Sequence, residues 1–323
     1  MANEGIASLY TNQRNSADRL RTDASVIFLI IFMLLCSFSL FACEKHEVAY
    51  TMLNVCSDTQ QADAHVMKFS NGQVYVIDVG MPGSTGGERL IAYLKKENIK
   101  KIDKLFLSHA HIDHYGGVAD LLESTINIRE VFLNIPDKEV CDSEKPWGCD
   151  YQHYLSVINA FERKGISVKP VSNGDFFQAA PSAALQVLFA HNGIDPPVGR
   201  TDINDTSYIM KLSVGNQAIL FAGDLNEILG DFLIKELGDR LRANILKVPH
   251  HGTEAVAKNA FFDLVSPEAA LIPAPAGLWQ NERSQRIRQY FQDKNTAVYV
   301  SGILGDVSVL LWKDRYQIIT NKQ

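Results

Sequence analysis

The run Ser-His-Ala-His-Ile-Asp-His at residues 108–114 restricts the possible folds of this chain more than any other feature. It follows the apolar stretch Lys-Leu-Phe-Leu, which predicts a buried β-strand. In an extended chain, His109 and His111 point to the same side, and Asp113 and His114 reach the same point from the following turn. Imidazole nitrogen and carboxylate oxygen are ligands that zinc and similar ions prefer. The alternative is a chance surface cluster, but the strand before it favours a metal site.

Two further apolar stretches end in the same kind of side chain. Residues 217–224 (QAILFAGD) end in Asp224, and residues 244–252 (NILKVPHHG) carry the pair His250 and His251. Asp224 alone also fits the N-cap of the helix that follows. Together with the first run, these segments supply at least six nitrogen and oxygen ligands, which is enough for a binuclear metal centre.

Strand and helix patterns alternate along the chain from about residue 47 to residue 323. Amphipathic periodicity predicts helices at 87–99, 118–125, 151–165, 227–241 and 284–294. Alternating apolar runs predict strands between them, with hairpin turns at 71–72 and 214–216. This order indicates one α/β domain in which helices cover the sheets.

Residues 1–43 are expected to lie outside that domain. The segment 24–42 carries no charge, follows several arginines and is long enough to cross a bilayer, as in a signal peptide. It ends before Cys43, which resembles a bacterial lipoprotein signal with this cysteine lipidated. An uncleaved signal anchor and a buried helix are the alternatives. The lipoprotein and anchor readings predict an exported domain, bound to the bacterial cell membrane through its N-terminal segment.

Composition bears on partners and on disulfides. The net charge of −6 counts against a protein that binds phosphate backbones tightly by charge alone, although metal ions can supply local positive charge in a nuclease. None of the five cysteines shows the spacing of a metal site. Cys141 and Cys149 are eight positions apart, so in an exported domain they form either a small disulfide loop or two unpaired thiols.

With these motifs the chain resembles the metallo-β-lactamase superfamily. Its HAHIDH run, an upstream IDVG (77–80), FAGD (221–224) and KVPHHG (247–252) follow that family's order. More narrowly, the Asn204-Asp-Thr-Ser segment and the downstream K-x-P-H-H-G resemble the hydrolase domain of the ComEC/Rec2 competence proteins and their free-standing relatives. The resemblance covers most of residues 50 to 312 and implies an α/β fold of the αββα four-layer sandwich type.

The resemblance also implies a role for each candidate residue. In order along the chain, His109 and His111 would bind the first metal, Asp113 and His114 the second, Asp224 would bridge both, and His250 would complete the second metal. His251 would then face the substrate, although the reverse assignment of the pair stays open. Asp113 or the free histidine would move a proton during catalysis. Asp78 either orients a ligand histidine or is a turn residue at a strand end.

The sequence departs from the family pattern at one position. Many members carry another ligand histidine for the first metal before the G-D strand, but residues 199–207 contain none. His191 either substitutes for it or is a partly solvated loop residue. The first metal is therefore expected to be weakly held, or oxygen-ligated and better suited to manganese. His46, His65 and His153 are expected to have no part in the site.

The expected activity is hydrolysis, with two divalent ions, Zn or Mn, activating water. The fold accommodates lactam, thioester, lactone and phosphodiester substrates, so it does not select one. The likeness to competence proteins favours a phosphodiester, including single-stranded DNA, while exported relatives that act on cell-surface phosphocholine favour a small molecule. A lactone or lactam hydrolase and a non-catalytic metal-binding module are the alternatives. The insertion 137–154 either walls the substrate cleft or is an ordinary surface loop.

Overall fold

The computed structural model describes residues 45–144, 148–191, 202–253 and 255–321. The chain divides into two units, residues 1–45 and 46–323, and the elements below belong to the second. None of the helices in the described ranges is both long and apolar enough to cross a membrane. The expected signal or anchor segment, 24–42, lies outside the described residues.

The first sheet has eight strands in the order β17-β16-β1-β2-β3-β5-β7-β8. In that order they are Tyr316–Thr320, Val307–Leu311, Val48–Met52, Ala64–Phe69, Val74–Val79, Lys104–Phe106, Glu130–Phe132 and Ser167–Lys169. From β17 to β3 neighbouring strands run antiparallel, and from β3 to β8 they run parallel. The predicted hairpin between β2 and β3 is confirmed.

The second sheet has seven strands in the order β15-β14-β13-β12-β11-β10-β9. In that order they are Ala297–Val300, Ala269–Ile272, Ile245–Lys247, Gln217–Phe221, Ile209–Val214, Ala183–Phe189 and Phe176–Ala180. Strands β12 to β15 run parallel, and β9 to β12 run antiparallel, which confirms the second predicted hairpin. A small parallel pair, β4 (Lys101–Ile102) and β6 (Asn127–Ile128), stands apart.

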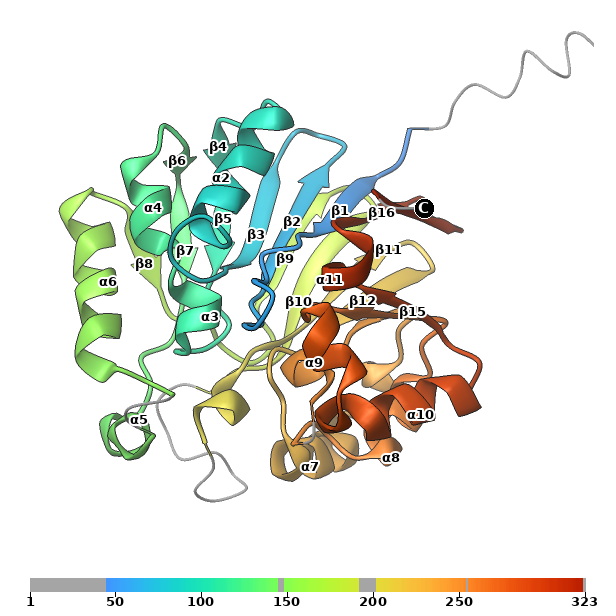
Figure 1. Cartoon of the computed structure of the whole chain (residues 1–323). Helices are drawn as coiled ribbons and strands as arrows, with labels where there is room; N and C mark the ends of the chain where they lie inside the picture. Colours follow the sequence, from blue (N-terminus) through green and yellow to red (C-terminus); the bar gives the residue numbers. More distant parts are fainter. Residues whose placement is uncertain (1–44, 145–147, 192–201, 254, 322–323) are drawn as a thin grey trace, which may run out of the picture. The chain divides into compact units, whose positions relative to one another are not determined.

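Strand side chains alternate between two hydrophobic layers, as the two-residue period requires. In β12, Ile219 and Phe221 face the core between the sheets, whereas Leu220 faces the helices outside. The helices α2 (Gly87–Lys96), α4 (Val118–Glu123) and α6 (Tyr151–Arg163) cover the first sheet. The helices α7 (Glu227–Leu237), α8 (Asn259–Val265) and α10 (Gln285–Asp293) cover the second. Figure 1 shows these layers, and the predicted αββα sandwich is confirmed.

Short helices lie in the loops around the strand ends. They are α3 (Ile112–Tyr115), α5 (Lys138–Ser143), α9 (Ala276–Gln280), α11 (Ser301–Leu304), η1 (Ile203–Thr206), η2 (Gly238–Leu241), η3 (Pro249–Gly252) and η4 (Glu282–Ser284). Strand β5 ends at Phe106, so His109 and His111 do not alternate along an extended strand as the sequence suggests. They lie in the loop that leads into α3, with His111 at its N-cap.

Candidate metal centre

Four of the candidate residues converge where loops leave both sheets. Asp113, His114, Asp224 and His251 each offer a ligand atom, and these atoms all lie within 4.8 Å of one another. The Nε2 atoms of His114 and His251 lie 3.2 and 3.1 Å from Oδ2 of Asp224. His251 Nε2 also lies 3.3 Å from Oδ2 of Asp113. A single carboxylate, Asp224, therefore contacts two buried imidazoles, one in α3 after a strand of the first sheet and one in η3 after a strand of the second.

The other ring nitrogen of each of these histidines is occupied. His114 Nδ1 lies 2.8 Å from Oδ2 of Asp78, and His251 Nδ1 donates to the carbonyl oxygen of Pro273 over the same distance. Asp78 is itself held by Ser108, whose backbone N–H and hydroxyl both donate to it. Such contacts fix the tautomer and direct Nε2 of both rings toward Asp224. Asp78 thus orients His114 through this contact. Its backbone has a positive φ of 59°.

His109 and His111 extend the cluster beyond His114 through ring contacts. The ring of His109 lies 4.1 Å from that of His114 and 4.8 Å from that of His111, between centroids. Nδ1 of His109 contacts the Ser108 hydroxyl at 3.1 Å, whereas its Nε2 is buried and has no hydrogen-bond partner within the described ranges. A buried nitrogen without a partner is costly unless a ligand occupies it. The geometry therefore leaves His109 Nε2 ready to bind a cation.

His250 and His251 occupy different environments. Both have a positive φ, 49° and 55°, which turns the two rings apart at the end of β13. His251 is buried in the cluster, whereas His250 lines the cleft above it and its Nδ1 contacts Oδ1 of Asn226 at 2.8 Å. The sequence analysis favoured His250 as the ligand of the second metal. The structure instead places His251 among the candidate ligands.

The cleft over the cluster has a volume of about 230 Å³. Its lining includes His111, Asp113, Asp224 and His250, together with Thr59, Gln60, Gln61, Met81, Ile112, Gly148 and Asn204. The cleft thus reaches the candidate ligands from outside. Part of the insertion 137–154 lines it through Gly148, whereas Tyr154 is buried in the core. Trp147 lies outside the described residues.

The segment that lacks a histidine contributes an amide to the cleft. Asn204, in η1, lines the cleft, and its Oδ1 is buried with no hydrogen-bond partner in the part of the chain that the structure describes. This oxygen lies in the segment 199–207, where a further ligand histidine was expected and the sequence has none. His191 is also buried, but it is not among the residues that line the cleft in the described part of the chain.

Two charged residues that the sequence analysis did not single out lie behind the cluster. Lys247, the lysine of KVPHHG, is buried and forms an ion pair with Asp63, and its Nζ lies 3.3 Å from Oδ1 of Asp224. It also donates to the carbonyl oxygen of Gly223 at 2.8 Å. His65, expected to be uninvolved, is buried 3.6 Å from Asp63. The sequence signals for Lys247 were its place in the K-x-P-H-H-G motif and the unusual presence of a lysine within an apolar strand.

Mutual charge interactions set the protonation of the cluster. Burial disfavours the charged histidine, but the carboxylates of Asp224 and Asp63 raise the pKa of His251 to about 10. Burial would also lower the pKa of His114, but the carboxylates of Asp224 and Asp113 hold that pKa well above its usual value. Burial and the neighbouring histidines push the pKa of His109 well below its usual value. Protons thus occupy part of the cluster, and His109 stays neutral.

The donor set fits divalent metal ions. Imidazoles and carboxylates from several loops converge in a buried place, and among the described residues Nε2 of His109 has no hydrogen-bond partner. Zinc, manganese and iron all accept such ligands. In a second group, Asp63, Asp78 and His114, the potential ligand atoms also lie within 4.8 Å of one another. In that group Asp63 is paired with Lys247, so its charge is already balanced.

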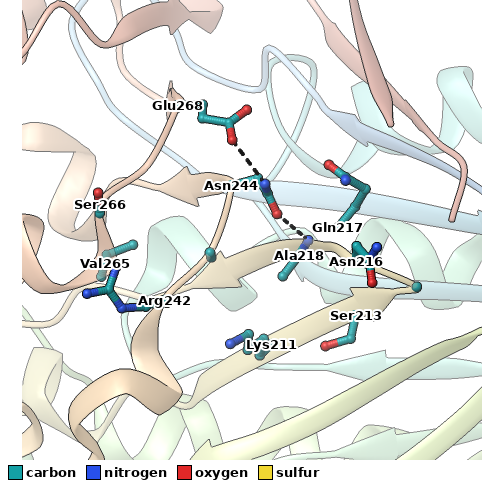
Figure 2. Close-up of a pocket in the computed structure, with 12 residues that line it drawn as sticks. Lys211, Ser213, Asn216, Gln217, Ala218, Arg242, Asn244, Val265, Ser266 and Glu268 are labelled. Atoms are coloured by element: carbon teal, nitrogen blue, oxygen red, sulfur yellow. Dashed lines mark hydrogen bonds between the residues drawn. The ribbon is translucent and has the colours of Figure 1, made fainter. Parts of the chain in front are cut away.

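A second, larger cleft of about 400 Å³ has a different character. Its lining includes Lys211 and Arg242, and Asn244 bridges it, accepting from the backbone N–H of Ala218 at 3.0 Å and donating to Glu268 at 3.1 Å (Figure 2). None of the candidate ligands lines it. These hydrogen bonds connect β12 to the loops beside it, so the polar side chains of this cleft have a structural role.

The disulfide that the sequence left open is present. Cys141 and Cys149 are bonded, and both are buried against the core under α6. They enclose Glu144, whose Oε2 lies 2.7 Å from Nε2 of His111. The sequence analysis did not identify Glu144 as a functional residue, because nothing in its spacing connects it with a histidine 33 positions earlier.

Comparisons with known proteins agree with this architecture. Residues 58–135, which contain the HAHIDH run, match the sequence model of the metallo-beta-lactamase superfamily. The structure of CmlA β-hydroxylase, E377D mutant, aligns with a TM-score of 0.52 and 14% identity over 82% of this chain and 54% of that one, which shows a shared fold. The protein therefore has the metallo-β-lactamase fold with a cluster of potential metal ligands at its loop edge.

The curated relatives specify the likeness further. The chain is 26% identical to ComE operon protein 3 of Bacillus subtilis over 65% of its length, which is 25% of that protein. It is 24% identical to Recombination protein 2 of Haemophilus influenzae over 77% of its length, which is 27% of that protein. The predicted resemblance to competence proteins is confirmed. The chain spans about a quarter of the length of these relatives.

Proposed function

We propose that this chain is a hydrolase that holds two divalent cations and cleaves phosphodiester bonds. The observation that carries the proposal is the position of Asp224, whose carboxylate contacts His114 and His251 beneath a cleft that His111 and Asp113 also line. A carboxylate between two groups of imidazoles is the arrangement that a bridging ligand of a binuclear centre requires.

The described side chains divide into two ligand groups around Asp224. His109 Nε2, His111 and the amide oxygen of Asn204 would hold the first cation. Asp113, His114 and His251 would hold the second. The first group contains one histidine fewer than in many relatives, and an amide oxygen suits manganese as well as zinc. When bound, such a pair of ions polarises the scissile ester and the attacking water.

His250 is then the side chain available for proton transfer at the substrate. Asn226 donates from Nδ2 to Asp202, so its Oδ1 faces His250 and accepts a hydrogen bond from the Nδ1–H of that ring. The remaining nitrogen, Nε2, therefore carries the lone pair of the neutral ring. Burial lowers the pKa of His250, which keeps the ring neutral near pH 7. Such a ring can take a proton from a group bound in the cleft.

The names of the relatives support nucleic acid as the substrate class. One relative carries the name of a recombination protein, and another, from Neisseria gonorrhoeae, that of a competence protein. The net charge of −6 counts against binding by overall positive charge, and cations at the centre would offset the charge of a phosphodiester. We further propose that the segment 24–42 exports the domain and anchors it to the cell membrane, as a lipoprotein or by one span.

A metal-dependent activity assay tests the proposal directly. The purified full-length chain, loaded with Mn²⁺ or Zn²⁺, is assayed on bis-p-nitrophenyl phosphate, single-stranded DNA, nitrocefin and a lactone. Hydrolysis of either phosphodiester that chelation abolishes is the expected result. Turnover of nitrocefin or the lactone alone overturns the substrate assignment. Fewer than about one bound metal per chain and no turnover identify a non-catalytic module.

A further inference from the structure

We infer that Glu144 positions His111 for metal binding, and that the Cys141–Cys149 disulfide holds Glu144 in place. The inference rests on the proposed metal centre. It makes the affinity of the first cation site depend on a loop that contributes no metal ligand of its own.

Both oxygens of the Glu144 carboxylate are engaged in the structure. Oε2 lies 2.7 Å from Nε2 of His111, and Oε1 accepts a hydrogen bond from the backbone N–H of Ile203 at 2.7 Å. Ile203 begins η1, which also carries Asn204. Two contacts at opposite oxygens fix the plane of the carboxylate, so Glu144 joins three separate segments at the edge of the cleft.

The contact with Glu144 selects the tautomer of His111. An ionised carboxylate only accepts hydrogen bonds, so Nε2 of His111 must carry the proton. The lone pair of the neutral ring is then on Nδ1, which becomes the atom that can bind a cation. Asp78 has the equivalent relation to His114, where it contacts Nδ1 and leaves Nε2 toward Asp224. Carboxylates in this position commonly set the orientation and basicity of metal-bound histidines.

The disulfide supplies the rigidity that the loop lacks by itself. Glu144 is the C-cap residue of α5, a helix of six residues that is too short to be stable alone. Cys141 lies in that helix, and its bond to Cys149 closes the chain around Glu144. Both sulfurs are buried against the core cluster that contains Tyr154. The bond therefore ties the loop to the first sheet's helical layer.

The chain at Gly148 lies too close to Glu144 for a side chain at that position. A Cβ atom at Gly148 would lie 2.5 Å from Oε2 of Glu144 and 2.8 Å from its Cβ. Glycine at this position lets the returning chain pass beside the carboxylate. Glycine at position 148 is thus compatible with the contact between Glu144 and His111.

The test combines metal titration with a direct measurement of the His111 tautomer. The full-length chain, labelled with ¹⁵N-histidine, is compared with Glu144→Ala, Glu144→Gln, the double variant Cys141→Ser/Cys149→Ser and the control Glu139→Ala. Glu139 is an exposed carboxylate in the same helix. Zn²⁺ affinity and stoichiometry come from competition with a chelating dye, and nitrogen chemical shifts report the tautomer of the metal-free ring.

We expect Glu144→Ala to weaken one of two Zn²⁺ sites by about 10- to 100-fold and to reduce the Nε2–H tautomer of His111. Glu144→Gln keeps an acceptor oxygen and should show a smaller loss. The double cysteine variant should resemble Glu144→Ala, and the control should match wild type. Unchanged affinity in Glu144→Ala overturns the inference, and so does a lost ion with an unchanged tautomer, since Glu144 would then be a ligand. Wild-type protein that binds no metal overturns the proposed function instead.

Discussion

Lys247 and Asp63 form a buried ion pair directly behind the candidate metal centre. The lysine comes from the end of β13 and the aspartate from the residue before β2, so the pair joins the two sheets. Its ammonium also lies 3.3 Å from Asp224, and it therefore shares its charge between two carboxylates. Burial alone would raise the pKa of Asp63, but the charges of Lys247 and His251 hold it well below its usual value.

Replacing the lysine should therefore destabilise the protein strongly. Lys247→Met leaves two buried carboxylates without their shared cation, and we expect a loss of about 3–5 kcal/mol in the free energy of unfolding. Urea unfolding of the metal-free protein measures it. Lys258→Met, which breaks the exposed pair with Asp231, is the control and should leave the free energy of unfolding nearly unchanged. Equal losses in both variants would contradict a special role for the buried pair.

The histidine pair of KVPHHG should separate metal binding from substrate contact. His251→Ala removes a ring buried against Asp224, so we expect the chain to lose at least one of its two metals and nearly all activity. His250→Ala should keep both metals and lower kcat by about 10²- to 10⁴-fold, because only proton transfer is affected. Metal analysis and phosphodiester kinetics on the two variants measure the difference.

A suitable control for the pair is His153→Ala. This histidine is exposed and contacts the hydroxyl of Tyr115 at 2.9 Å, outside the cleft. It should keep both metals and full activity. Loss of metal in His250→Ala with metal retained in His251→Ala would reverse the assignment made here and restore the preference drawn from the sequence.

The choice between His250 and His251 shows where sequence reasoning stops. The motif and its place after a strand were sufficient to predict that one histidine of the pair approaches the centre. Which one does so depends on a positive φ at both residues, and non-glycine residues rarely adopt that conformation. Asp78 has the same conformation. The positive φ of these three residues has no local sequence signal, because the surrounding strands and loops impose it.

Long-range contacts were the other part that the sequence could not provide. The runs at 108–114, 217–224 and 244–252 were recognisable because each combines an apolar strand with polar residues at its end. Glu144 and Asp63 reach the site only through tertiary structure. Both are ordinary acidic residues in the sequence, and only the fold brings one to His111 and the other to Lys247.

Asp224 should be the residue whose loss affects metal binding most. Asp224→Asn keeps the size of the side chain but removes the charge that His114 and His251 both face. We expect fewer than two bound metals and a loss of activity of about 10³-fold or more, since the shared ligand is lost. Inductively coupled plasma analysis and phosphodiester kinetics measure both. Asp239→Asn, at an exposed surface position, is the control, and retention of two metals in Asp224→Asn would contradict a bridging role.

Metal binding should release protons and strengthen with pH. The pKa of His251 is raised to about 10 and that of His114 also lies well above its usual value, so both rings are protonated near pH 7 in the metal-free protein. A cation binds only the neutral ring. Affinity should therefore rise about tenfold per pH unit for each proton displaced. Calorimetry in buffers of different ionisation enthalpy counts these protons, and a pH-independent affinity would contradict the protonation assigned to the cluster.

Asp205 should limit stability at neutral and alkaline pH. This buried carboxylate in η1 accepts the backbone N–H of Asn226, but burial and the neighbouring Asp202 raise its pKa from 3.8 to about 7. The folded state therefore holds this proton more tightly than the unfolded state does. The resulting stability is complete below about pH 4 and is lost as the pH rises through 7.

Asp205→Asn keeps an acceptor oxygen and cannot ionise, so it removes this dependence. Relative to wild type, its free energy of unfolding should increase between pH 4 and 7 by on the order of 2–4 kcal/mol and stay constant above that range. Urea unfolding of the metal-free proteins at several pH values measures the difference. Asp239→Asn changes an exposed carboxylate and should show no such trend. A constant difference between Asp205→Asn and wild type at every pH would mean that Asp205 is ionised in the folded protein, in which case its contact with Asn226 outweighs the effect of burial.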